Sequence, residues 1–347
     1  MKNKPCKYGT HRVLEPVGVL PQAADKLDNS INIYSNEILI DVISLNIDSA
    51  SFTQITNAAG HDPKKIETEI LEIVHKRGKM QNPITGSGGM LIGIVAKIGD
   101  DLSHRDLKVG DKIATLVSLS LTPLKINAIK AIHINIDRVD VDARAILFET
   151  GIYAKLPEDM SGELALAALD VAGAPAQTAK LVRPGDSVLI LGGGGKSGML
   201  CCNEAMKRVG PTGKVVAICV LEEDREILLT AGLCHEVIIA DAAKTLDVLE
   251  KAIKVNNGSE YDISINVVNV PYTEMSSILP VRDGGIVYLF SMATDFTRAA
   301  LGAEGAGKDI TMIIGNGYTK DHAEITLAQL RENPKLRAIF EKRYGKA

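Results

Sequence analysis

The chain has 347 residues, a formal net charge of −4 at pH 7 and 46% hydrophobic residues. This length allows two domains with cores of their own, and the composition is ordinary for a globular enzyme. The acidic balance and the 4% of aromatic residues, with no Trp, argue against a nucleic-acid partner. No apolar run is long enough for a membrane span. The five cysteines form no C-x-x-C pair, so we expect reduced thiols in a cytoplasmic protein.

The first 155 residues predict a β-rich domain. A strand is expected over residues 37–45, followed by a loop over 46–52. Asp62 and Pro63 then begin a helix, with Asp as the N-cap and Pro at the first helical position. Glycine turns and alternating apolar residues indicate several further strands up to residue 141. Together these signals predict a barrel-like domain.

A glycine turn follows the apolar strand expected at residues 188–191. Gly193, Gly195 and Gly198 fit G-x-G-x-x-G, and a helical pattern follows them. In this fingerprint the first glycine makes the turn, the second lets the backbone approach a pyrophosphate, and the third lets the helix pack on the strand. A P-loop would need a glycine five residues before Gly195, but Ile190 occupies that position, inside the strand. The other alternative is a merely flexible loop, and the alternation of strands and helices after the turn argues against it.

Strands and helices alternate after the glycine turn. Further strands are expected over residues 214–220, 236–240, 261–268, 284–290 and 310–314. The alternation predicts a doubly wound parallel sheet, a Rossmann dinucleotide-binding domain over residues 156–317. The cofactor-binding candidates lie in the turn and after the expected strands: Gly193, Gly194, Gly195, Lys196, Ser197, Gly198, Cys219, Glu222, Arg225, Asn269 and Ser291.

With these elements in place, the chain resembles the medium-chain dehydrogenase/reductase superfamily. The segments that carry the resemblance are the glycine turn and residues 93–95, 109–111, 156–161 and 182–190. The resemblance implies a chaperonin-10-like β-barrel catalytic domain, over residues 1–155 and about 318–347, beside the dinucleotide-binding domain. It also implies an active site in the cleft between the two domains.

The positions of the zinc ligands differ from those of zinc-dependent members. Asn46 stands where these members place a Cys, and Gly89 stands in place of the His of Gly-His-Glu. The four-cysteine structural lobe is also missing from the sequence. A catalytic zinc needs three protein ligands, so we predict an enzyme without metal, in which side chains handle protons and charge.

Residues 13–29 and 45–52 resemble a zinc-free branch, the L-erythro-3,5-diaminohexanoate dehydrogenases of bacterial lysine fermentation. The resemblance implies NAD(P)-dependent oxidative deamination of a diamino acid, with ammonia and 5-amino-3-oxohexanoate as products. We expect NAD as the cofactor because residues 222–224 are acidic, although Cys219 at the strand end and the nearby Arg225 would tolerate NADP. A homodimer is expected. A zinc-free quinone or enoyl reductase and an inactive nucleotide sensor remain alternatives.

Carboxylates are the expected catalytic groups. Hydride loss from C3 needs a neutral amine, so a carboxylate can serve as a general base, and another can hold the second ammonium group. Each carboxylate has the alternative role of a helix cap or a solvated surface acid. The catalytic candidates are Asp48, Glu149 and Asp170, and the substrate-binding candidates are Asn46, Ser49 and Ser51.

Overall fold

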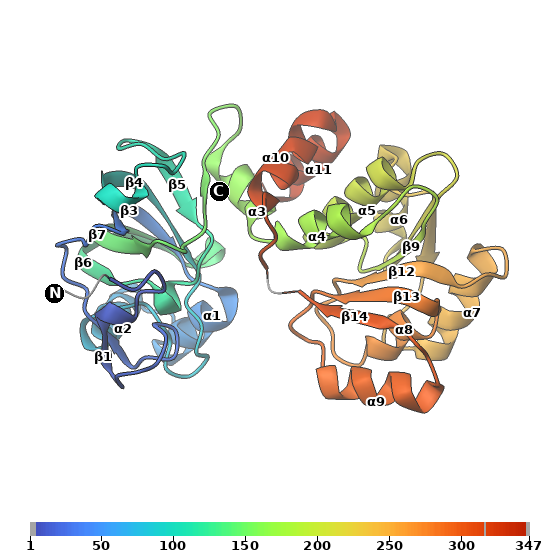
Figure 1. The fold of residues 1–347 in the computed structure, drawn as a ribbon, viewed down its shortest axis with the longest axis horizontal. Coiled ribbons are helices and arrows are strands. Elements are labelled where there is room, and N and C mark those ends of the chain that lie inside the picture. The colour runs from blue at the N-terminus through green and yellow to red at the C-terminus, as the bar shows by residue number, and fades with distance from the viewer. Residues whose placement is uncertain (1–4, 316, 345–347) are drawn as a thin grey trace. The chain divides into compact units, whose positions relative to one another are not determined.

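The chain divides into two compact units, Met1–Asp159 and Met160–Ala347, which are described separately (Figure 1). The structure is a computed structural model that describes residues 5–315 and 317–344. The predicted boundary after residue 155 lies close to the observed one. Within the described ranges, no helix combines the length and the apolarity that a bilayer crossing requires.

The first unit is built around an antiparallel sheet, as the sequence predicts. Its order within the described residues is β6-β7-β3-β4-β5-β8, and a small pair, β1 (Val13–Glu15) with β2 (Lys26–Leu27), accompanies it. The strands are β3 (Glu37–Asn46), β4 (Met90–Ile98), β5 (Lys112–Thr115), β6 (Leu124–His133), β7 (Arg138–Phe148) and β8 (Tyr153–Lys155). Helices α1 (Ser49–Ala58) and α2 (Pro63–Arg77) connect β3 to β4. Asp62 caps α2 through a hydrogen bond from the Lys64 amide, as predicted.

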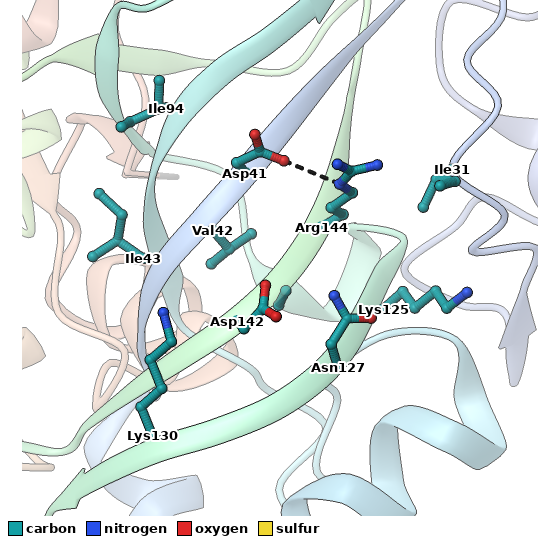
Figure 2. Close-up of a pocket in the computed structure, with 11 residues that line it drawn as sticks. Ile31, Asp41, Val42, Ile43, Ile94, Lys125, Asn127, Lys130, Asp142 and Arg144 are labelled. Carbon is teal, nitrogen blue, oxygen red and sulfur yellow. Dashed lines mark hydrogen bonds and ion pairs between the residues drawn. The ribbon is translucent and has the colours of Figure 1, made fainter.

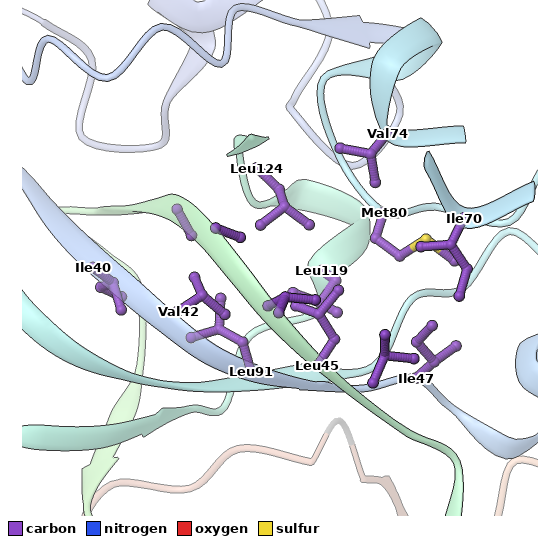
Figure 3. Close-up of a cluster of buried hydrophobic side chains, with 14 of the residues drawn as sticks. Ile40, Val42, Leu45, Ile47, Ile70, Val74, Met80, Leu91, Leu119 and Leu124 are labelled. Carbon is purple, nitrogen blue, oxygen red and sulfur yellow. The ribbon is translucent and has the colours of Figure 1, made fainter. Parts of the chain in front are cut away.

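The core of the first unit lies between this sheet and the apolar faces of α1 and α2 (Figure 3). Ile38, Ile40 and Val42 alternate toward the core because successive side chains of a strand point to opposite faces. The pairing register shifts between Val42 and Ser44, so that Leu45 also faces inward. The shift lets β3 remain anchored in the core up to its penultimate residue.

A buried ion pair fixes the beginning of β3. Glu37 is fully buried and accepts hydrogen bonds from Arg12 Nε at 2.7 Å and Arg12 Nη2 at 2.6 Å, while His11 Nε2 lies 2.8 Å away. Burial alone would raise the pKa of Glu37, but the donors from Arg12 and His11 outweigh it and lower the pKa to about 2. Both ends of β3 are therefore held firmly.

The second unit is a parallel sheet covered by helices on both faces. Within the described residues its order is β11-β10-β9-β12-β13-β14. This is the 3-2-1-4-5-6 arrangement of dinucleotide-binding folds, which confirms the predicted doubly wound sheet. The strands are β9 (Ser187–Leu191), β10 (Lys214–Cys219), β11 (Glu236–Ile239), β12 (Tyr261–Asn266), β13 (Val281–Leu289) and β14 (Thr311–Ile314). The helices are α3 (Gly162–Leu169), α4 (Gly173–Leu181), α5 (Lys196–Val209), α6 (Glu222–Ala231), α7 (Thr245–Val255), α8 (Glu274–Ile278), α9 (Phe296–Ala306), α10 (His322–Glu332) and α11 (Pro334–Tyr344).

The C-terminal segment differs from the prediction, which returned residues 318–347 to the barrel-like domain. Its described part, up to residue 344, forms α10 and α11 and belongs to the second unit. There α10 packs on α3, α4 and α5, and α11 packs on α3. The physical reason is burial of the apolar side chains of Leu330, Leu336 and Phe340, each of which is fully buried.

Candidate functional site

The glycine turn between β9 and α5 is tightly packed at Gly193 and Gly198, among others. A side chain at Gly193 would lie 2.7 Å from the Cβ of Ala217, and one at Gly198 would overlap the carbonyl oxygen of Gly192. Gly192 itself has a φ of +88°, in the left-handed region that favours glycine. Gly193 makes the turn and Gly198 brings the helix onto the strand, as the fingerprint predicts.

Gly195 is a glycine that the described chain itself does not require. Its φ is −81°, it is exposed, and a Cβ built there meets only the Gly192 carbonyl oxygen, at 3.6 Å. It is also the N-cap of α5 and provides no side-chain cap, so the first amide groups of the helix lack a side-chain acceptor there. The open space and these amides suit the close approach of a pyrophosphate.

Lys196 and Ser197 form the first residues of α5, and Asp170 lies beside them. Lys196 Nζ donates to Asp170 Oδ2 at 2.7 Å and lies 5.8 Å from the ring centre of Tyr344. Asp170 follows α3, and its side chain is 53% exposed. The structure therefore places this catalytic candidate at the glycine turn, as the partner of a cation.

The other predicted cofactor contacts after the strands share one edge of the sheet. The register aligns Leu191 with Ile218 and with Asn266, so β9, β10 and β12 end together. Ser291 follows β13 and accepts a hydrogen bond from the Ala293 amide, at 3.1 Å. Cys219 ends β10 and Asn269 follows β12, where it is exposed. This carboxyl edge is where open α/β sheets bind their ligands.

Two residues that the sequence prediction did not assign lie at the same turn. Arg343 donates from Nη1 to the Gly194 carbonyl oxygen at 2.9 Å and from Nη2 to Asp224 Oδ1 at 2.8 Å. Asp224 precedes the buried Leu228 by four residues, so the two share the inward face of α6. This spacing is a signal that could have identified Asp224. Arg343 is 119 residues further along the chain, and no local pattern indicates it.

The predicted pair Glu222 and Arg225 differs from Asp224 in its surroundings. Arg225 Nη1 lies 3.7 Å from Glu222 Oε2, with side chains 45% and 68% exposed. Both lie on the first turns of α6. Among the described residues, neither side chain makes another ion pair or a side-chain hydrogen bond. Asp224 therefore replaces Glu222 as the carboxylate next to the glycine turn.

Asp48 stands at the end of β3 in the first unit and is the N-cap of α1. Its Oδ1 accepts from the Ser51 amide at 3.1 Å, and its Oδ2 accepts from Ser87 Oγ at 2.7 Å. Ser51 Oγ lies 2.9 Å from Ser87 Oγ and 2.5 Å from Thr85 Oγ1. The carboxylate and three hydroxyl groups thus form a connected chain that can pass a proton. Ser87 and Thr85 come from a separate loop, and the sequence prediction did not include them.

Of the three substrate-binding candidates, Ser51 belongs to this network, whereas Asn46 and Ser49 have other surroundings. Asn46 ends β3, and its buried Oδ1 has no hydrogen-bond partner among the described residues. Ser51 belongs to the Asp48 network, whereas Ser49 donates to Asp137 Oδ2 at 2.6 Å on the surface. A buried acceptor without a partner is uncommon in proteins, so Asn46 offers a place for an external donor.

Glu149 lies at the opposite end of β3 from Asp48. Asn36, just before β3, donates to Glu149 Oε2 at 3.1 Å. Since β3 has ten residues, its two ends are separated by about 30 Å. The structure therefore does not bring these two catalytic candidates together, and one active site cannot use both.

Zinc does not fit the residues at the end of β3. Gly89 has a φ of +97°, and a side chain there would overlap the carbonyl oxygen of Asn46. A ligating residue at position 89 would therefore need a different backbone. In the described parts of the chain, no three His, Cys, Asp or Glu side chains gather into a set of metal ligands.

We expect the purified protein to contain no stoichiometric zinc and to keep its activity after dialysis against a chelator. The reason is the pair of residues at positions 46 and 89, which supplies no thiolate or imidazole. Elemental analysis and an assay before and after dialysis check this expectation. One zinc per chain, lost together with activity, would contradict it.

A pocket of about 500 Å³ opens on the exposed face of β3, β4, β6 and β7 (Figure 2). An ion pair between Arg144 Nε and Asp41 Oδ1, at 3.1 Å, lies within it, together with Lys125, Lys130 and Asp142. None of the predicted site residues lines this pocket. We therefore do not include it in the candidate site.

A family model matches a segment that lies within the first unit, and two relatives match almost the whole chain. Residues 11–157 match the family model described as the L-erythro-3,5-diaminohexanoate dehydrogenase N-terminal domain. The L-erythro-3,5-diaminohexanoate dehydrogenase of Acetoanaerobium sticklandii is 69% identical over 342 residues, 98% of this chain and 99% of that protein. The enzyme of the same name from Fusobacterium nucleatum subsp. nucleatum is 65% identical, with the same coverage.

A solved structure with a similar fold is that of CurK enoyl reductase. It has a TM-score of 0.53 and 17% identity, and the match covers 91% of this chain and 81% of that one. At this identity the likeness concerns the fold alone. It confirms the fold class expected from the superfamily resemblance, an antiparallel barrel-like part joined to a doubly wound parallel sheet.

Proposed function

Because this chain belongs to the L-erythro-3,5-diaminohexanoate dehydrogenase family, we propose that it oxidatively deaminates L-erythro-3,5-diaminohexanoate with NAD as the acceptor. The observation that carries the proposal is 69% and 65% identity over almost the full length of two relatives with that name. The products are 5-amino-3-oxohexanoate, ammonia and reduced cofactor. The expected cytoplasmic location and homodimer stay predictions.

The second unit provides suitable residues for a nicotinamide dinucleotide. The open space at Gly195 and the uncapped amides of α5 would receive the pyrophosphate, and Lys196 would add a positive charge. A bound nicotinamide would supply the acceptor for the hydride that leaves C3 of the substrate. Burial raises the pKa of Cys219 to about 12, so the strand end presents a small neutral thiol. The carboxylates of Glu222, Glu223 and Asp224 favour NAD, because they repel a 2′-phosphate.

Asp48 is the group to which we assign the proton transfers. A substrate ammonium must first lose a proton, since only the neutral amine can release a hydride from its carbon. Water then adds to the iminium carbon, and the C–N bond breaks as the oxygen is deprotonated and ammonia leaves. One water is consumed and one proton is released for each ammonium ion and each reduced cofactor formed. The hydroxyl chain of Ser87, Ser51 and Thr85 offers these protons a route away from Asp48.

Asn46 is the residue to which we assign an ammonium group of the substrate. Its Oδ1 is a buried acceptor without a partner among the described residues, and an ammonium brings donors only. The assignment also explains an amide at a position where zinc-dependent relatives need a thiolate. A neutral amide can accept from the ammonium without binding a metal.

The proposal is tested by a substrate screen that follows the absorbance of the reduced cofactor. We expect NAD reduction with L-erythro-3,5-diaminohexanoate, with one ammonia released for each cofactor reduced. Simple alcohols and common α-amino acids serve as controls and should give no comparable rate. Reduction of quinones or enoyl compounds with NADPH, or cofactor binding without any turnover, would overturn the proposal in favour of the corresponding alternative.

A further inference from the structure

The end of β10 lacks the usual residue for recognising an adenosine ribose. Dinucleotide folds specific for NAD place an Asp or Glu there, about 20 residues beyond the glycines, to accept a hydrogen bond from the ribose 2′-hydroxyl. Cys219 occupies the end of β10, and its neutral thiol is a weak acceptor. A different carboxylate must therefore recognise the ribose if the protein prefers NAD.

Asp224 brings a carboxylate back to this place from the first turn of α6. Its Oδ2 is so close to Gly194 that a side chain at position 194 would overlap it. The Asp224 side chain is only 18% exposed, although two other acids precede it on the same helix turn. The carboxylate therefore lies against the glycine turn rather than in solvent.

Arg343 holds this carboxylate in position from the C-terminal helix. It connects Asp224 Oδ1, at 2.8 Å, with the Gly194 carbonyl oxygen, at 2.9 Å. The fully buried Leu336 and Phe340 anchor α11, and Lys335 Nζ donates to the Thr230 carbonyl oxygen at 3.0 Å near the other end of α6. The Arg343 contact engages Oδ1, and the described residues make no hydrogen bond to Oδ2, so Oδ2 can accept from a hydroxyl donor.

We propose that Asp224 binds the adenosine ribose of NAD, and that Arg343 positions it, so that this pair sets the preference for NAD over NADP. This inference rests on the proposed function. In the intact pair, Asp224 neutralises Arg343 and repels a 2′-phosphate. Without the carboxylate, the guanidinium is free to bind that phosphate, because Arg presents donors that match phosphate oxygens.

The test is the affinity of the full-length protein for NAD and for NADP, measured by calorimetry without substrate. Asp224→Ser should weaken NAD binding about 10- to 100-fold, as expected for losing a hydrogen bond to a charged group, and should strengthen NADP binding. In the double variant Asp224→Ser/Arg343→Gln, the gain for NADP should disappear while the loss for NAD remains. A purely structural ion pair would change stability without shifting the ratio of the two affinities toward NADP.

Glu226→Ser is the matched control, since it removes an exposed carboxylate from the same helix. It should leave both affinities unchanged, and thermal unfolding should show that each variant is folded. If Asp224→Ser does not fold, Asp224→Asn keeps the size and one acceptor oxygen and should still shift the ratio toward NADP. An unchanged ratio in a folded variant overturns the inference alone. Failure of the unaltered protein to bind either dinucleotide overturns the proposed function as well.

Discussion

Asp48→Asn is expected to lower kcat by about 10²–10⁴-fold, the usual contribution of a general acid–base group, while cofactor affinity stays close to that of the unaltered protein. Asparagine keeps the oxygen that accepts from the Ser51 amide, and Asn and Asp are about equally good N-caps. The substitution therefore removes the negative charge next to Ser87 without removing the cap of α1. Steady-state kinetics, a cofactor titration and thermal unfolding together separate these effects.

Asp62→Asn is the matched control for this change. Asp62 caps α2 in the same unit through a hydrogen bond from the Lys64 amide at 2.9 Å, so it repeats the structural role of Asp48 without the hydroxyl network. Its substitution should leave kcat unchanged. If instead Asp48→Asn retains nearly full activity and Glu149→Gln is inactive, the base is Glu149, at the other end of β3.

Gly195→Val is expected to raise the Kd for NAD at least about 100-fold, a loss of about 3 kcal/mol, in a protein that still folds. The backbone at Gly195 is extended and its Cβ position is open, so the chain itself accepts a side chain there. The cost to folding is limited to a poorer N-cap for α5, about 1 kcal/mol. The lost affinity comes from filling the space that the pyrophosphate needs.

Gly198→Ala, in the same motif, is expected to lower stability, whereas Gly195→Val is expected to lower NAD affinity. Its Cβ would overlap the Gly192 carbonyl oxygen, so we expect the free energy of unfolding to fall by about 1–3 kcal/mol. Urea unfolding and NAD titration of both variants distinguish the two kinds of glycine. Unchanged NAD affinity in folded Gly195→Val would show that the pyrophosphate lies elsewhere.

The sheet of the second unit could be predicted because each of its strands is a short apolar run bounded by turns. In such folds the strand order follows from the alternation of strands and helices. The glycine turn could be predicted for the same reason, since its requirements are local. Helix periodicity shows that α10 and α11 have apolar faces, but not which surface covers them. The prediction that residues 318–347 return to the barrel-like domain therefore differs from the packing of their described part in the second unit.

The candidate site was predictable where its residues are neighbours in sequence and not where they are distant. Asn46, Asp48 and Ser51 lie within six positions of one another, and the structure keeps them together at the end of β3. Ser87 joins Asp48 from 39 positions away, and Arg343 joins Asp224 from 119 positions away. Neither contact is encoded by a local pattern, because each depends on the packing of separate elements.

The proposed reaction removes a hydride from the carbon bearing the 3-amino group. Its most direct test uses L-erythro-3,5-diaminohexanoate with deuterium at C3, incubated with NAD and the unaltered protein. We predict that the deuterium appears in the reduced cofactor and that one ammonia is released for each deuterium transferred. Reduced cofactor without deuterium, or no reduction of the cofactor at all, would contradict the claim.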